Sequence, residues 1–169
     1  YGVIDVLDYA DIDIARLEYG KADKMCGAAA VRYTVEAGKM AMNNILHAIV
    51  SAPLNKESMR MAGYKYEGQT EILGELTGSK NYGMFLILNQ LKILLHTTHM
   101  SLKNACDAVK KEKIFKNIIL AHEGLKFFKL DYPTIAVSAI NPHAGEGGLF
   151  GREEIDEIFP AIQEAKRMG

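Results

Sequence analysis

The 169-residue sequence is poor in cysteine, and its two thiols, Cys26 and Cys106, do not form a C-x-x-C pair. Two isolated cysteines cannot form a zinc knuckle, and they fit a reducing compartment better than a disulfide-bonded secreted fold. Because free cysteine usually behaves as a small apolar side chain, we expect both thiols to be buried.

Long apolar runs and a surplus of one charge are also missing. No apolar stretch reaches the ~20 residues that a membrane-spanning helix requires, and no signal segment opens the chain. The 20 basic and 21 acidic residues are interspersed, without a stripe of Lys and Arg between aromatics. We therefore expect a cytoplasmic protein that binds neither membranes nor nucleic acid.

Nucleotide-binding motifs are absent as well. The glycines near the end of the chain follow a predicted strand but do not spell G-x-G-x-x-G. The sequence contains neither a P-loop nor a nucleophile elbow. No residue for binding a dinucleotide cofactor can therefore be named from motifs.

With 49% hydrophobic residues and a net charge of -1, the sequence predicts one well-cored domain over residues 1–169. We expect helices at 24–46, 56–62, 70–76, 101–111, 114–128, 152–159 and 161–168, and strands at 3–7, 47–52, 83–88, 91–97 and 133–140. This alternation predicts an α/β fold with a mixed sheet and flanking helices. Since the chain starts without Met inside a predicted strand, we expect a piece of a longer protein.

Local signals set several of these boundaries. Asn55 and Ser101 are suited to cap the helices that follow them, and the dipeptide at 89–90 predicts a hairpin. Glu153 and Glu154 fall in the first turn of a predicted helix, where the helix dipole favours acids. We expect Pro160 to break that helix and to start the closing one.

Three polar clusters each follow a predicted strand: "SAPLNK" at 51–56, "HTTH" at 96–99 and "NPHAGE" at 141–146. Ligands of open α/β sheets gather outside the carboxyl ends of the strands. The clusters are therefore candidates for one shared crevice.

Two histidines, His99 and His143, lie in predicted loops, where imidazole is a common metal ligand. Taken singly, each also fits an ordinary hydrogen-bonded loop histidine. The other three, His47, His96 and His122, are expected to be structural. Lys56, beside a helix start, fits either an anionic substrate or a solvated surface.

In order, the segments "SAPLNKESMRMAGYKYEGQTEILGELTG", "LLHTTHMSL" and "NPHAGEGGLFGREEIDEIFPAI" resemble the 4-hydroxythreonine-4-phosphate dehydrogenases of vitamin B6 biosynthesis and relatives acting on phosphorylated four-carbon acids such as 4-phosphoerythronate. The resemblance covers almost the whole chain. An α/β domain with incidental histidines would require this three-cluster match to be chance. The resemblance implies a fold like isocitrate and isopropylmalate dehydrogenases, a homodimer, and a divalent metal held near the interface by histidines of both subunits.

Two of the family's histidines match His99 and His143, whereas Gln69 stands where the family usually has the histidine of G-H-T-E. An amide oxygen suits magnesium or manganese better than zinc, which leaves Zn, Mg, Mn and Co open. The resemblance further implies a catalytic contact from Lys56. It implies substrate contacts from Asn55, Thr70, Glu71 and Asn141.

The implied reaction is oxidation of a substrate hydroxyl by NAD or NADP, in which the metal polarises the hydroxyl and the β-keto acid product loses carbon dioxide. The glycines after His143 would let backbone approach the ligand, next to a helix start that suits an anion. Family members extend beyond both ends of this region, into parts that carry much of the nucleotide binding. The alternative is therefore a dimerisation and metal-binding module that has no catalytic activity alone.

Overall fold

The computed structural model describes residues 2–130 and 132–169, and the chain divides into two compact units, residues 1–80 and 81–169. Each unit has a hydrophobic cluster of its own. The expectation that residues 1–169 form one domain stays a prediction.

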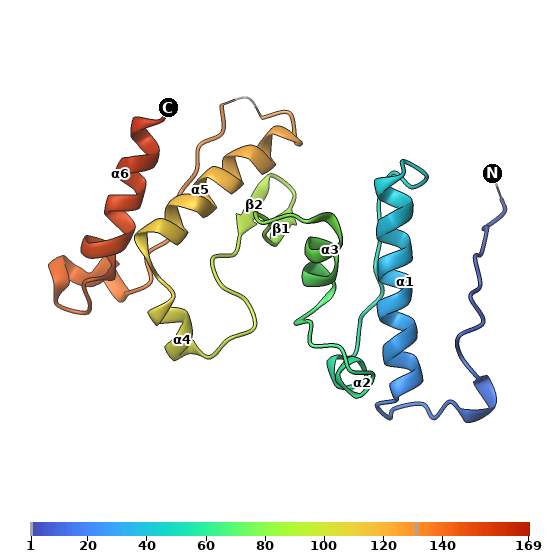
Figure 1. Cartoon of the computed structure of the whole chain (residues 1–169). Coiled ribbons are helices and arrows are strands. Elements are labelled where there is room, and N and C mark those ends of the chain that lie inside the picture. Colours follow the sequence, from blue (N-terminus) through green and yellow to red (C-terminus); the bar gives the residue numbers. More distant parts are fainter. Residues whose placement is uncertain (1, 131) are drawn as a thin grey trace. The chain divides into compact units, whose positions relative to one another are not determined.

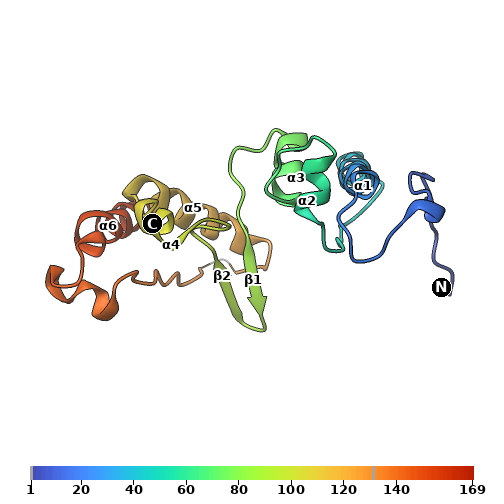
Figure 2. The same cartoon turned by 90° about the horizontal axis from the view of Figure 1, so that it is seen from below.

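The first unit is helical. It contains the short 3-10 helix η1 (Ile14–Arg16) and the helices α1 (Lys24–Met42), α2 (Lys56–Met61) and α3 (Gln69–Thr77). The views show α2 and α3 beside α1 (Figures 1 and 2). Their shared core consists of Val31, Met59 and Ile72, packed against Val35, Leu54 and Tyr66.

Side-chain caps and one close backbone contact fix these helices. Asp23 accepts a hydrogen bond from the Cys26 amide at the start of α1, and Asn55 accepts one from the Ser58 amide at the start of α2, which confirms the predicted cap. Gly27 packs directly on the Ser58 carbonyl, where a Cβ would overlap the backbone. The α1 and α2 backbones therefore meet without an intervening side chain.

The second unit begins with an antiparallel hairpin of β1 (Phe85–Leu88) and β2 (Leu91–Leu94), paired from Phe85 with Leu94 to Leu88 with Leu91. The hairpin predicted around residues 89–90 is confirmed, and Asn89 supplies the positive φ of 51° at its turn. Two helices follow, α4 (Leu102–Asp107), capped by Ser101 as predicted, and α5 (Lys111–Lys126).

The last part of the second unit consists of the turn η2 (Pro142–Gly148), the π-helix η3 (Glu154–Ile158) and α6 (Phe159–Arg167). The π-helix η3 and α6 pack on α5, and η2 packs on η3. Val109, Ile114, Ile158 and Ala161 form the core of this part, and both views show α5 next to α6.

Pro160 does not break the helix, so that part of the prediction was wrong, whereas its predicted place in the first turn of the closing helix is confirmed. The Phe159 amide donates to the Glu154 carbonyl, five residues back, and the helix continues through Pro160 into α6. Proline has no N–H and clashes with the preceding turn of a regular α-helix. The wider π turn directly before Pro160 accommodates it, and π turns recur at functional sites.

The strands predicted at 3–7, 47–52 and 133–140 were also wrong: in the described residues these segments have no strand partner, and the sheet has two strands. Ile4 is 88% exposed and Val50 is 98% exposed. Residues 133–138 alternate half-buried and exposed, as a strand does, but among the residues that the structure describes no second strand pairs with them. The α/β class is confirmed, whereas a larger mixed sheet is not present in the described chain.

Two further expectations have clear outcomes. Cys106 is exposed, contrary to prediction, whereas Cys26 is partly buried and burial raises the pKa of its thiol. Among residues 2–130 and 132–169, no helix has the length and apolar character needed to cross a membrane.

Candidate functional site

The loop that carries His143 is a left-handed turn. Residues 143–147 all have positive φ, between 45° and 80°, and three of them, His143, Ala144 and Glu146, are not glycine. A left-handed conformation costs an L-residue about 1–2 kcal/mol. Such strain persists only where the surroundings fix it, and it is concentrated at functional sites.

A buried carboxylate holds the start of this loop. One oxygen of Glu154, Oε1, accepts hydrogen bonds from the backbone amides of Ile140 (2.9 Å) and Asn141 (2.8 Å), and Oε2 accepts from the Asn141 side-chain amide (2.9 Å). Glu154 is only 2% exposed. The side-chain and backbone hydrogen bonds from Asn141 outweigh the effect of burial and lower the pKa of Glu154 to about 2.

Two glycines let the loop close around this carboxylate. A Cβ on Gly145 would lie 2.9 Å from Glu154 Oε2 and 2.9 Å from the Gly151 carbonyl oxygen, and a Cβ on Gly151 would lie 2.5 Å from Asn141 Nδ2. A Cβ on Gly147 would meet no atom within 4 Å beyond its chain neighbours, so only the φ of 66° favours glycine there. The glycines at 145 and 151 therefore allow the backbone to pack closely around the Glu154 carboxylate.

Both predicted metal ligands are strained and accessible. His143 (φ 51°) and His99 (φ 54°) are exposed, and no hydrogen bond engages either ring among the described residues. The His143 ring lies 6.3 Å from the Phe150 ring, centroid to centroid. The other histidines do not have positive φ. Both imidazoles therefore have ring nitrogens free for a ligand.

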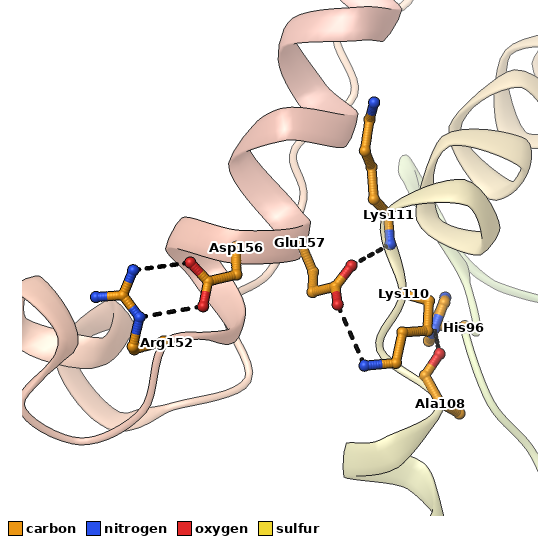
Figure 3. A network of polar contacts seen from close by, with 7 residues as sticks. All are labelled: His96, Ala108, Lys110, Lys111, Arg152, Asp156 and Glu157. Carbon is orange, nitrogen blue, oxygen red and sulfur yellow. Dashed lines mark hydrogen bonds and ion pairs between the residues drawn. The ribbon is translucent and has the colours of Figure 1, made fainter.

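His96 anchors the loop that carries His99. Its Nε2 donates to the Ala108 carbonyl oxygen (3.0 Å; Figure 3), and its Nδ1 accepts from the Asn117 side-chain amide (3.0 Å). These partners match the neutral tautomer with the proton on Nε2. The structural role predicted for His96 is confirmed.

The π turn that carries Glu154 also holds the start of α5 (Figure 3). Glu157 accepts from the Lys111 amide (2.7 Å) and from Lys110 Nζ (3.2 Å), and these contacts lower the pKa of its carboxyl. On the exposed side, Arg152 and Asp156 form a two-point ion pair with distances of 3.1 and 2.9 Å. The π turn is thus held by Glu157 on the side that faces α5 and by Asp156 on its exposed side.

The predicted site residues of the first unit lie at the starts of α2 and α3. Asn55 caps α2, Lys56 is its first residue, and Thr70 and Glu71 lie in the first turn of α3. Gln69 donates from Nε2 to the Ala52 carbonyl oxygen (3.1 Å), and its Oε1 accepts no hydrogen bond in the described chain. The amide oxygen is therefore available to a ligand.

Asn141 is committed within the loop. Its side-chain nitrogen donates to Glu154 and also to Glu153 Oε2 (2.6 Å). Only its side-chain oxygen remains to meet a substrate, so that the substrate contact expected of Asn141 stays a prediction.

The structure thus places the predicted residues in two groups, with His99, Asn141 and His143 in the second unit and the others in the first. Their joining into one site stays a prediction. No group of three or more His, Cys, Asp or Glu side chains suited to a metal occurs within the described ranges. The available donors are two imidazoles and one amide oxygen, a mixture that transition metals and magnesium both accept.

Sequence reasoning missed Glu154 as the organiser of the loop. It assigned this residue to the first turn of a helix, but the partners of its carboxylate lie 13 and 14 residues earlier. The available signal was the density of glycines between the histidine and the acid.

Comparison with known proteins gives a consistent result. The family model described as "Pyridoxal phosphate biosynthetic protein PdxA" matches residues 2–169. A candidate D-threonate 4-phosphate dehydrogenase of Fusobacterium nucleatum is 40% identical over 168 residues, which are 99% of this chain and 50% of that protein. The 4-hydroxythreonine-4-phosphate dehydrogenase of Aquifex aeolicus is 42% identical over 160 residues, 94% of this chain and 50% of the relative.

A solved structure agrees in fold. The crystal structure of 4-hydroxythreonine-4-phosphate dehydrogenase from Klebsiella pneumoniae matches with a TM-score of 0.83 and 38% identity, over 92% of this chain and 47% of that one. The chain spans about half the length of the curated relatives it matches.

Replacing Gly145 by alanine should destabilise the protein more than the same change at Gly147. Both positions have positive φ, 80° and 66°, but only the Gly145 Cβ would meet Glu154 and the Gly151 carbonyl. We expect Gly145→Ala to lower the free energy of unfolding by about 1–3 kcal/mol more than Gly147→Ala, as overpacking does. Urea unfolding followed by circular dichroism measures both, and equal losses would contradict the packing around Glu154.

Acid should remove the contribution of Glu154 to stability. Its pKa in the folded chain, about 2, lies below the ordinary value of 4.5, so the stabilisation is present above about pH 4.5 and is lost as the pH falls toward 2. The difference in unfolding free energy between wild type and Glu154→Gln should therefore shrink from pH 7 to pH 3. Glu157 titrates in both proteins, so the difference isolates Glu154. A difference that stays constant over this range would contradict the assignment.

Proposed function

Because the chain belongs to the family of the pyridoxal phosphate biosynthetic protein PdxA, we propose that it forms the metal-binding part of an NAD- or NADP-dependent dehydrogenase. The proposed substrate is a phosphorylated four-carbon hydroxy acid, the class named by its relatives. The observation that carries the proposal is that His99 and His143, where the sequence resemblance implies metal ligands, are both exposed and have positive φ. We also propose that the fold of the whole protein is similar to that of isocitrate and isopropylmalate dehydrogenases.

The donors present fit a divalent metal. His99 and His143 would each supply a ring nitrogen, and Gln69 would supply Oε1, since its Nε2 is held by the Ala52 carbonyl. A divalent metal bound by them would supply Lewis-acid stabilisation of negative charge on the substrate oxygen during oxidation and decarboxylation. The metal is zinc, magnesium, manganese or cobalt, and Gln69 favours the harder ions.

Charge and hydrogen bonding define the proposed roles of the other residues. Lys56 forms no ion pair in the described chain, so its ammonium group is available to the phosphate or carboxylate of the substrate. Asn55, Thr70, Glu71 and Asn141 would orient the substrate through their remaining polar atoms. We also propose a two-fold homodimer with the metal site near its interface.

Assays separate this enzyme from the alternative, a metal-binding module that is inactive alone. The substrates named by the relatives are 4-hydroxythreonine 4-phosphate and D-threonate 4-phosphate, which carry an amino or a hydroxyl group at carbon 2. Each is tested with NAD and NADP on the 169-residue chain and on the full-length Klebsiella enzyme. Reduced cofactor from both proteins supports the enzyme, whereas metal binding with no reduced cofactor from the chain supports the module.

Removing either loop imidazole should weaken metal binding. We expect His99→Ala and His143→Ala each to lower the affinity for a divalent metal about tenfold or more, because one ligand is lost. Calorimetric titration with zinc and with magnesium measures the change. His47→Ala is the matched control, since His47 is exposed but lies outside the proposed ligand set. Unchanged affinity in both loop variants would remove the proposed site.

Changing Gln69 to histidine should alter which metal is preferred. If Oε1 of Gln69 is a ligand, Gln69→His replaces a hard oxygen by a nitrogen donor and should tighten zinc or cobalt relative to magnesium. Competitive titration of the two proteins gives the affinity ratios. Equal zinc-to-magnesium ratios would exclude Gln69 from the ligand set and leave His99 and His143 as the only protein ligands proposed.

A further inference from the structure

We propose that Glu154 is a positioning residue, whose buried carboxylate holds His143 in its left-handed conformation and so presents the imidazole. Glu154 does not touch the ring, so this action passes through the backbone. The proposal deepens the proposed function, in which His143 is a metal ligand.

Glu154 is linked to His143 through Asn141, to which it is hydrogen-bonded, and Pro142, which follows in the chain. Glu154 binds the backbone amide and the side chain of Asn141, and the Asn141 carbonyl oxygen accepts from the Ala144 amide (3.2 Å). The residue between Asn141 and His143 is Pro142, whose ring fixes its own φ. His143 is thereby enclosed in a four-residue turn whose first member is held at its amide, side chain and carbonyl.

This turn places an unusual residue at its strained position. A proline at the second position and a positive φ at the third are typical of a type II turn, where the third residue is normally glycine or asparagine. Here the third residue is His143, with φ 51° and ψ 30°. The hydrogen bonds that Asn141 donates to Glu154 fix the first residue of this turn, and the fixed turn in turn favours the positive φ of His143.

Glu154 can act as a fixed point because the core of the second unit fixes it. Its carbonyl accepts from the Phe159 amide, and Ile158 in the same π turn is buried in the core. Glu157 ties this turn to the first residues of α5 (Figure 3). The hydrogen bonds to the loop therefore start from a rigid part of the unit.

The first test reads the His143 ring without any metal. In the chain labelled at histidine with ¹³C and ¹⁵N, we expect Glu154→Gln to shift the ring resonances of His143, which lies next to the Phe150 ring. His96, hydrogen-bonded to Ala108 and Asn117 in the same unit, should keep its resonances. Asp156→Asn is the control, since it removes a charge from the same π turn but from a side chain whose hydrogen bonds, among the described residues, go to Arg152. Unchanged His143 resonances in Glu154→Gln would overturn the proposal.

If the His96 resonances also change in Glu154→Gln, the variant has not folded correctly. A second pair of variants then tests the proposal. Gly145→Ala presses on Glu154 Oε2 and leaves its charge, whereas Gly147→Ala has the same kind of backbone penalty and touches nothing. We expect the His143 signal to move in Gly145→Ala and to move much less in Gly147→Ala. Equal responses of the two would overturn the proposal.

Metal titration separates this proposal from the proposed function. With zinc or magnesium alone as the probe, Glu154→Gln should lower affinity by about tenfold, as loss of an outer-shell partner does. If His143 resonances move but the affinity stays as in wild type, the positioning role stands and the ligand role of His143 fails. If affinity falls while His143 resonances do not move, the positioning role fails.

Discussion

The hydrogen bonds that Ile140 and Asn141 donate to Glu154 are the constraint on which the loop of the second unit depends. A buried carboxylate is unfavourable unless several donors meet it, and three donors from one short segment do so here. Those donors determine where the segment ends and where its left-handed turn begins. The glycines at 145 and 151 are the consequence, because any side chain there would enter the same space.

The π turn extends this constraint to the helices. Pro160 cannot donate a hydrogen bond, and the turn before it widens, with the Phe159 amide bonded to the Glu154 carbonyl. Glu157, within the same turn, accepts from the first amide of α5 and so supplies the cap that Lys110 cannot. One irregular turn therefore fixes both the loop that carries His143 and the start of α5, which contributes Ile114 to the core.

Features of the fold that depend on neighbours in sequence could be predicted, and features that depend on distant partners could not. Asn55 and Ser101 each accept a hydrogen bond from an amide three residues ahead, and the hairpin turn contains two residues. The local sequence is therefore enough to predict each of these features. Residues 47–52 and 133–140 have the composition of strands, but a strand exists only where another strand pairs with it. The candidate ligands His99 and His143 were identified by motif, whereas Glu154 was missed because its partners are far back in the chain.

The two candidate ligands share a property that the sequence does not display. His99 and His143 have φ of 54° and 51°, while the described histidines at 47, 96 and 122 have ordinary negative φ. A positive φ is uncommon for any residue other than glycine, although histidine, with asparagine and aspartate, adopts it more often than other residue types. An imidazole kept at a strained position, exposed and without a hydrogen-bond partner in the described chain, is stabilised only by its surroundings. At His143 those surroundings are a charged carboxylate and two glycines, which together fix the backbone and leave the ring free for a ligand.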